Sequence, residues 1–249
     1  MSLVVLTGAT SGIGRAAAAR LRAEGHEVVG VGRSAAADVR CDFASLEAVR
    51  ELAAELPPRF DVLVNNAGIV SDGRKVSTEG IELTFAVNHL APYLLTRLVL
   101  DRVSRVVTTA SAAHMGAEID PDDPAPLGGS FWKAYQRSKL ANVLFTRELA
   151  RRWDGGAANC LHPGVIRSRL AREAGLVRSL AWRVGGLFMA SPAAGADTLV
   201  WLATSEEAGR ETGGYFERRG RLEVAGQAAV DEAAERLWEI SADMVGLPA

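Results

Sequence analysis

A tyrosine and a lysine four residues apart, Tyr135 and Lys139, are the side chains in this sequence best suited to acid–base chemistry. They fall in a segment predicted to be helical, Phe131 to Trp153, so both side chains project from one face. The pKa of a free tyrosine is roughly 10, too high for efficient proton transfer near neutral pH. A nearby ammonium group favours the phenolate and lowers that pKa. Taken alone, a Tyr/Lys pair at this spacing is usually a solvated helix face.

Ser111 supplies a hydroxyl at the end of a predicted strand, in the run Val106-Val107-Thr108-Thr109-Ala110-Ser111. Ligands of open α/β sheets bind beyond the carboxyl ends of the strands, so this hydroxyl can reach a substrate oxygen. The alternative is a serine that caps a helix or forms a turn.

A glycine-rich turn, Thr7 to Gly14, follows the first predicted strand and precedes an alanine-rich helix. Glycines let the backbone turn tightly and approach a pyrophosphate, which then sits on the unpaired N–H groups of the helix. An ordinary strand–turn–helix junction is the alternative, but the position directly after the first strand favours nucleotide binding. The residues predicted to bind the cofactor here are Gly8, Ser11, Gly12, Ile13 and Gly14.

Short runs of Val, Ile and Leu alternate with longer amphipathic stretches, which is typical of βαβ units and a parallel sheet. We therefore predict a single α/β domain over residues 1–249, with a Rossmann-type doubly wound parallel sheet of about seven strands and helices on both faces. The predicted strands are Leu3–Thr7, Glu27–Val31, Val39–Cys41, Val62–Asn65, Arg105–Thr109, Ala158–Leu161 and Gly214–Glu217. The predicted helices begin near Ile13, Ser45, Thr78, Phe131, Pro192 and Val230.

Two local features depart from this regular plan. Only Ser34 to Asp38 separates the second predicted strand from the third, whereas a parallel crossover usually takes a dozen residues including a helix. Either a bare loop makes the crossing or the third strand is a vestigial edge. Pro92, inside the helix predicted from Thr78 to Leu100, predicts a kink that deprives the Asn88 carbonyl of its helical hydrogen bond.

Composition argues against several other classes of protein. The 28 Lys and Arg residues nearly balance 30 Asp and Glu, so we expect no nucleic-acid partner. The two cysteines, Cys41 and Cys160, form no CxxC or metal-spaced set, and we expect both to be buried structural residues in a reducing compartment. The four histidines lack metal-ligand spacing, so no metal site is predicted. We also expect no membrane span, because no apolar stretch reaches roughly 18–20 residues, and hence a cytoplasmic protein.

The order of these motifs resembles the short-chain dehydrogenase/reductase family over essentially the whole chain. The sequence is most similar to its retinol-dehydrogenase-like branch. The resemblance is carried by the glycine turn, Asn65-Asn66-Ala67-Gly68, Phe85-Ala86-Val87-Asn88-His89-Leu90, Ser111, the Tyr135/Lys139 pair with Ser138 to Leu149, His162 to Ser168, Gly213-Gly214-Tyr215-Phe216 and Ala234 to Trp238.

The resemblance implies a role for each matching residue in hydride transfer between nicotinamide and a carbonyl/alcohol pair. Tyr135 would exchange the proton with the substrate oxygen, and Lys139 would lower the tyrosine pKa and hold the nicotinamide ribose. Ser111 would hydrogen-bond the reacting oxygen, and Asn88 would bind a relay water. The remaining cofactor contacts implied are Asp42 and Phe43 at the adenine, Asn66, Ala67 and Gly68 beside the adenosine, and Pro163, Gly164, Val165 and Ser168 at the nicotinamide.

The end of the second strand favours NADP(H) over NAD(H). An NAD enzyme would place a carboxylate there to accept from the ribose 2′-OH, but Gly32 leaves that place empty. Arg33 follows, and its planar fork of donors suits a 2′-phosphate; Arg15 is a candidate second contact. The alternative is a surface arginine at a strand end.

Three readings of the function remain on the sequence alone. The leading one is an NADP(H)-dependent carbonyl reductase or alcohol dehydrogenase. A non-catalytic nucleotide sensor is disfavoured because all three reactive residues are present. A nucleotide-sugar epimerase is disfavoured because little chain follows Pro163.

The chain departs from the branch in ways that bear on the substrate. It lacks the helix after the second strand, and no hydrophobic anchor precedes the first strand, which weakens the case for a retinoid substrate. The predicted specificity loop, Leu170 to Ala190, is apolar and suggests a hydrophobic small molecule, although a helix packed on the core or on a partner fits as well. Relatives commonly pair helices between subunits, so we expect a homodimer or homotetramer.

Overall fold

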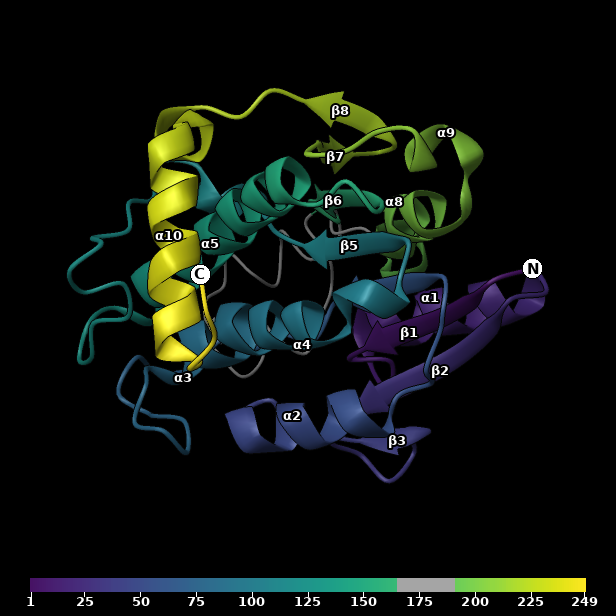
Figure 1. Ribbon diagram of the computed structural model, residues 1–249, viewed down its shortest axis with the longest axis horizontal. Helices are drawn as coiled ribbons and strands as arrows, with labels where there is room; N and C mark the ends of the chain where they lie inside the picture. The colour runs from purple at the N-terminus through teal and green to yellow at the C-terminus, as the bar shows by residue number, and fades with distance from the viewer. Residues whose placement is uncertain (165–190) are drawn as a thin grey trace, which may run out of the picture.

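Short apolar runs form the strands of a single sheet in the computed structural model, which describes residues 1–164 and 191–249 (Figure 1). The strand order is β3-β2-β1-β4-β5-β6-β7-β8, and neighbours are parallel except β7 and β8. The order reverses between β1 and β4, the position at which open α/β sheets bind ligands. The strands are β1 (Leu3–Thr7), β2 (Glu27–Gly32), β3 (Val39–Arg40), β4 (Val62–Asn65), β5 (Arg105–Thr109), β6 (Ala157–Leu161), β7 (Tyr215–Glu217) and β8 (Gly220–Leu222).

Helices cover both faces of this sheet. Val4 and Leu6 of β1 pack toward α1 and α8, whereas Val5 between them packs toward α2, α4, α5 and α10, as the two-residue period of a strand requires. The predicted doubly wound fold is therefore confirmed. The helices are α1 (Gly12–Ala23), α2 (Leu46–Glu55), α3 (Leu83–Phe85), α4 (Ala91–Val99), α5 (Phe131–Arg152), α8 (Pro192–Thr204), α9 (Glu206–Gly209) and α10 (Asp231–Met244).

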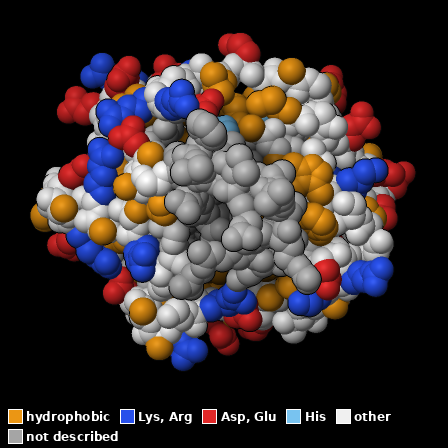
Figure 2. Space-filling model, turned by 180° about the vertical axis from the view of Figure 1, so that it is seen from behind, with side chains coloured by type: hydrophobic (Ala, Val, Ile, Leu, Met, Phe, Trp, Pro, Cys, Tyr) orange, Lys and Arg blue, Asp and Glu red, His pale blue; other side chains and the backbone are white. Residues whose placement is uncertain are grey.

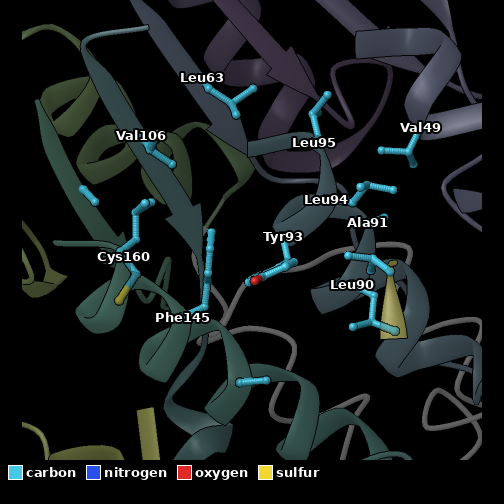
Figure 3. Close-up of a cluster of buried hydrophobic side chains, with 14 of the residues drawn as sticks. Val49, Leu63, Leu90, Ala91, Tyr93, Leu94, Leu95, Val106, Phe145 and Cys160 are labelled. Carbon is cyan, nitrogen blue, oxygen red and sulfur yellow. The ribbon is translucent and has the colours of Figure 1, made fainter. Parts of the chain in front are cut away.

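An aromatic cluster fixes α4 and α5 against the sheet. The rings of Tyr93 and Phe145 meet edge to face at 5.5 Å, close to Leu63 and Val106 of the strands (Figure 3). Trp238 of α10 closes the cluster, with its ring 5.1 Å from that of Tyr93 and its carbonyl accepting from the Tyr93 hydroxyl. Burying each such ring contributes about 1.5–3 kcal/mol. This packing holds α5, the helix that carries Tyr135 and Lys139, in a fixed position.

The connection from β2 to β3 is a bare loop, and β3 is an edge strand of only two residues. The two alternatives stated for the short Ser34–Asp38 connection, a bare loop and a vestigial edge strand, are therefore both correct. Asp38 closes the turn, since its carboxylate accepts from the Gly30 N–H at 2.7 Å and from Arg22 at 2.8 Å. The Asp38 N–H in turn donates to the Gly30 carbonyl. The Asp38 carboxylate therefore ties this short crossover to the backbone of β2, where a helix would usually make the connection.

The helix expected from Thr78 begins later, at Leu83. Gly80 has a φ of +81° and ends the preceding turn in a conformation that no helix adopts. The buried carboxylate of Glu82 then caps the helix by accepting from the backbone N–H groups of Thr84 and Phe85 at 2.9 and 2.8 Å. The prediction placed the start too early because helical periodicity does not reveal a cap made by glutamate.

Pro92 lies just after a π-helical turn, Ala86–Leu90, that contains Asn88. In this turn the Ala91 N–H donates to the Ala86 carbonyl, five residues back. Pro92 has no N–H to donate, so the series of helical backbone hydrogen bonds is interrupted there. The preceding turn is widened into a π-helical turn, a feature often found at functional sites. A water at the Asn88 carbonyl stays a prediction.

The eighth strand was not predicted. β8 pairs antiparallel with β7 through a turn in which Arg218 and Arg219 have φ of 49° and 64°. Turns of this kind usually contain Asn or Gly, but here Asp197 of α8 holds the Arg219 guanidinium at 2.7 and 2.5 Å. A distant carboxylate therefore stabilises the turn, and no local pattern announces it.

One helical segment does reach the length and composition of a membrane span, contrary to the sequence-based expectation. Residues Leu83–Arg102 pass that test, yet 78% of the window is buried inside the fold. The segment is the core helix that packs against the sheet and α5, and it is apolar because most of its side chains are buried in that core.

The surface charges are mixed (Figure 2), and both cysteines lie inside the fold. Basic and acidic side chains are interspersed on the face shown in Figure 2. Cys41 and Cys160 are both free and buried, as expected, and burial raises the pKa of each thiol to about 12. Such thiols are poor nucleophiles.

The role of Asp38 in the second crossover can be tested by denaturation. Asp38→Ala leaves the Gly30 N–H without its acceptor and should lower the free energy of unfolding by about 1 kcal/mol. Asp38→Asn keeps an acceptor oxygen and should cost less. Arg22→Ala removes the half-exposed ion pair and an exposed hydrogen bond to the Val28 carbonyl, and we expect a loss of roughly 0.5 kcal/mol. An equal loss in the Arg22 and Asp38 alanine variants would show that the ion pair, and not the backbone contact, supports the turn.

Candidate active site

The glycine turn after β1 is built by a close approach of two backbone segments. A Cβ on Gly14 would lie 2.2 Å from the Gly8 carbonyl oxygen, so no side chain fits there. Gly12 has a φ of +52° and open space where its side chain would be. The Ser11 side chain makes no capping hydrogen bond, so it leaves the first N–H groups of α1 without the usual side-chain acceptor. A pyrophosphate fits this arrangement of donors and space.

The turn is tied to the end of β4 by the Thr7 hydroxyl. Thr7 Oγ1 donates to the Val64 carbonyl and accepts from the backbone N–H groups of Asn66 and Ala67 at 2.9 and 3.0 Å. The Asn66 amide donates back to the Thr7 carbonyl at 3.0 Å. The glycine turn and the Asn66–Gly68 segment therefore form two adjoining walls.

Ser111 and Tyr135 meet at the carboxyl end of β5. The Ser111 hydroxyl accepts from the Ala113 N–H at 3.2 Å as it caps a short 3₁₀ turn, Ala112–His114. Its hydroxyl lies close enough to Tyr135, one turn before Lys139 on α5, to lower the pKa of that phenol. The sequence separates these residues by 24 positions, and the fold brings their hydroxyls together.

Lys139 is buried beneath the same site. Its ammonium donates to the Thr109 carbonyl at 3.0 Å and lies 5.7 Å from the centroid of the Tyr135 ring. Burial lowers the pKa of Lys139 to about 8. The pKa of Tyr135 is raised, not lowered as the resemblance implied, because desolvation outweighs the opposing effect of the Ser111 hydroxyl. Both shifts have one cause, because leaving water penalises whichever form carries the charge.

Asn88 acts on the backbone beside the site. Its amide accepts from the Ile69 N–H at 2.7 Å and donates to the Ile69 carbonyl and the Ser138 hydroxyl. A Cβ on Gly68 would lie 3.2 Å from the Asn88 oxygen and 3.7 Å from the Lys139 nitrogen. Asn88 thus fastens the Gly68–Ile69 segment to α5, and a side chain on Gly68 would press against the Asn88 amide.

A cavity of about 700 Å³ unites these features, a volume suited to a dinucleotide-sized ligand. Arg33 lies on it as an exposed side chain. Asn88 and Arg15 are not among the residues that line it, and Val165, Ser168 and the predicted specificity loop lie outside the described residues. The predicted residues that line it are Gly8, Ser11, Gly12, Ile13, Gly14, Arg33, Asp42, Phe43, Asn66, Ala67, Gly68, Ser111, Tyr135, Lys139, Pro163 and Gly164.

The sequence missed part of the cavity wall. Val76, Leu83 and Val87 line it, from the segment between β4 and α4. That segment is held by the backbone N–H of Thr78, which donates to the Ala44 carbonyl at 3.0 Å. Isolated apolar residues in a connection carry no motif, so only the fold reveals this wall. The other lining residues not predicted as contacts are Thr10, Gly32, Ser34, Ala44, Ile69, Thr109 and Ala110.

Within residues 1–164 and 191–249, no group of three His, Cys, Asp or Glu side chains is placed to hold a metal ion.

The buried lysine makes a prediction about stability against pH. Its pKa is about 8 when folded and 10.5 as the ordinary value, so between these pH values the unfolded chain binds more protons and stability rises with pH. Lys139→Met removes this penalty. The variant should be more stable than wild type at pH 7, and the difference should shrink between pH 8 and 10.5, as measured by denaturant unfolding. Lys133→Met, at an exposed position on α5, is the control and should show a constant difference. A constant difference for Lys139→Met as well would contradict the burial penalty.

Comparison with known proteins agrees with this geometry. A family model described as short chain dehydrogenase matches residues 2–177. The chain is 42% identical over 270 residues to the provisionally named daunorubicin C-13 ketoreductase DnrU of Streptomyces sp. (strain C5), covering 98% of this chain and 92% of the relative. It is 37% identical over 284 residues to human retinol dehydrogenase 13, covering 99% and 85%.

Solved structures show the same relationship. An uncharacterized protein from Mycobacterium Paratuberculosis superposes with a TM-score of 0.80 at 29% identity, covering 100% of this chain and 96% of that one. A provisionally named NAD(P)-dependent gluconate 5-dehydrogenase from Beutenbergia cavernae, with bound NADP, superposes with a TM-score of 0.66 at 31% identity, covering 86% and 93%. The chain therefore belongs to the short-chain dehydrogenase/reductase family, in its retinol-dehydrogenase-like branch, and is an oxidoreductase acting on a CH–OH/C=O pair.

Proposed function

We propose that this protein transfers a hydride between NADP(H) and a small, hydrophobic carbonyl/alcohol substrate. The observation that carries the proposal is the convergence of Ser111, Tyr135 and Lys139 on the cavity that the glycine turn also lines. A nucleotide sensor without catalysis would need none of these three groups at the carboxyl edge of β5.

Bound NADP(H) would supply or accept the hydride, and the chain's own residues handle the substrate oxygen and its proton. The Ser111 oxygen accepts from the Ala113 N–H, and its one hydrogen, which faces Tyr135, would turn to donate to the substrate oxygen when substrate binds. Tyr135 gives its proton to that oxygen in reduction and removes it in oxidation. The raised pKa of Tyr135 keeps the phenol protonated near neutral pH, which suits reduction.

Lys139 balances the charge that develops as the phenol loses its proton. Its ammonium is 5.7 Å from the tyrosine ring, and in a buried site such an attraction is only weakly screened. It would also hold the nicotinamide ribose. Asn88 keeps the neighbouring Gly68–Ile69 wall in place.

The end of β2 supports NADP(H) as the cofactor. A Cβ on Gly32 would lie 3.3 Å from the Thr10 hydroxyl, so the carboxylate side chain of an NAD-dependent site would be crowded there. Arg33 and Ser34 lie on the cavity beside it, and an exposed guanidinium suits a 2′-phosphate.

The substrate proposal rests on the relatives and on the described wall. One relative is named for ketoreduction at C-13 of daunorubicin and another for retinol. The apolar residues Ile69, Val76 and Leu83 are consistent with a hydrophobic ligand in this cavity.

We further propose one domain over residues 1–249, a cytoplasmic location and assembly into a homodimer or homotetramer. Assembly would need a face other than the outer side of α4 and α5, because α10 packs there through Trp238 (Figure 1).

The mechanism is tested by Tyr135→Phe, assayed for NADPH consumption against a panel of ketones, aldehydes and quinones. Loss of a positioned general acid should reduce turnover by about 10²–10⁴-fold. NADPH binding, followed by the fluorescence of the bound cofactor, should survive. Lys139→Ala should lose turnover and also bind NADPH more weakly. Activity within a factor of a few of wild type in either variant would contradict the assigned roles.

The cofactor preference is tested by Arg33→Ala. Removing the guanidinium should raise the KM for NADPH and leave the KM for NADH almost unchanged, because only NADPH carries the 2′-phosphate. Arg59→Ala, an equal loss of charge at an exposed position off the cavity, should change neither. If Arg33→Ala weakened both cofactors equally, the arginine would be structural and the preference would have another origin.

A further inference from the structure

A buried histidine outside the cavity holds the backbone of Ser111. The His114 ring nitrogen Nδ1 lies 2.7 Å from the Ser111 carbonyl oxygen. A carbonyl oxygen can only accept, so Nδ1 must carry a hydrogen and donate it. The His114 backbone N–H donates to the same carbonyl at 3.1 Å. The Ser111 carbonyl therefore receives two hydrogen bonds from one residue, and one of them comes from a side chain.

The His114 ring is fixed in turn by β7. Its exposed fraction is only 3%, and it packs edge to face on Tyr215 with ring centroids 4.9 Å apart. The Tyr215 hydroxyl is buried and makes no hydrogen bond in the described part of the chain, so Tyr215 acts on His114 through its ring. His114 cannot rotate away without leaving this contact.

We propose that His114 is a positioning residue for catalysis, which aims the Ser111 hydroxyl at Tyr135 and the substrate oxygen. Ser111 has an extended backbone (φ −166°, ψ 152°) directly before the 3₁₀ turn that His114 closes. The two hydrogen bonds to the Ser111 carbonyl fix the peptide plane between Ser111 and Ala112, where the 3₁₀ turn begins. It therefore fixes the Ala113 N–H that occupies the acceptor side of the Ser111 oxygen. The inference rests on the proposed function, since it assigns a task to the hydroxyl that the reaction would use.

The chain offers a matched pair of variants for this test. Asparagine places an N–H group at nearly the position of Nδ1, whereas leucine has similar bulk and no donor. His114→Leu should lower kcat about tenfold, the worth of one ordinary hydrogen bond, and leave the KM for NADPH unchanged. His114→Asn should recover most of the lost kcat. A merely structural role would give equal losses in the two variants, or losses that follow the melting temperature.

A double-mutant cycle shows whether His114 acts through Ser111. In the Ser111→Ala background, His114→Leu should cost nothing further, because the hydroxyl that it positions is gone. A full additional tenfold loss would overturn the inference.

A spectroscopic readout separates this inference from the proposed function. The Ser111 hydrogen bond lowers the pKa of Tyr135, so misplacing the hydroxyl should raise that pKa. The phenolate absorbance, titrated with and without Tyr135→Phe, should report a higher Tyr135 pKa in His114→Leu than in His114→Asn. This comparison needs no turnover, so it stays decisive even if the wild-type protein reduced no carbonyl compound and the proposed function failed. Equal pKa values in the two variants would overturn the positioning role.

Discussion

The site depends on how closely the ends of β1 and β4 approach each other. Thr7 binds the Val64 carbonyl and two N–H groups of the β4 extension through a single hydroxyl. Gly14 can have no side chain, because the Gly8 carbonyl fills that space. The close approach of these two strand ends shapes the wall of the cofactor cavity, which lies where the strand order reverses between β1 and β4. The helix N-terminus on one wall and the Asn66–Gly68 segment on the other both follow from it.

Burial shifts the pKa values of Tyr135 and Lys139 from their ordinary values. The aromatic cluster around Tyr93 fixes α5 so that Lys139 lies beneath the sheet edge with a backbone carbonyl as its partner. Desolvation lowers the pKa of this lysine from 10.5 to about 8 and raises that of Tyr135 above 10.0, so the two values move apart. The phenol is therefore protonated near neutral pH, which is the form that a general acid needs in reduction. The same burial costs stability, as is common where a fold holds charged groups for chemistry.

Much of this arrangement could be predicted from the sequence, and each exception has a physical reason. β1, β4 and β5 have the predicted bounds because strands buried on both faces are continuous apolar runs. The sequence motifs placed the reactive residues, which lie at strand ends and on one helix face. The eighth strand and the wall around Val76 depend on contacts between distant residues, such as that of Arg219 with Asp197. The late start of the helix at Leu83 depends instead on a local cap by Glu82, a residue type that is not an ordinary helix cap. The Leu83–Arg102 segment contains polar residues among its apolar ones, so it has the mean hydropathy of a span without being one unbroken apolar run.

The central claim is that this cavity brings a nicotinamide and a carbonyl group together for direct hydride transfer. The most direct measurement uses NADPH carrying deuterium at C4 of the nicotinamide, in each of its two stereochemical forms, with a ketone that the protein reduces. Mass spectrometry of the alcohol should find deuterium on the former carbonyl carbon with one of the two forms and hydrogen with the other. An alcohol without deuterium from either form would contradict the account.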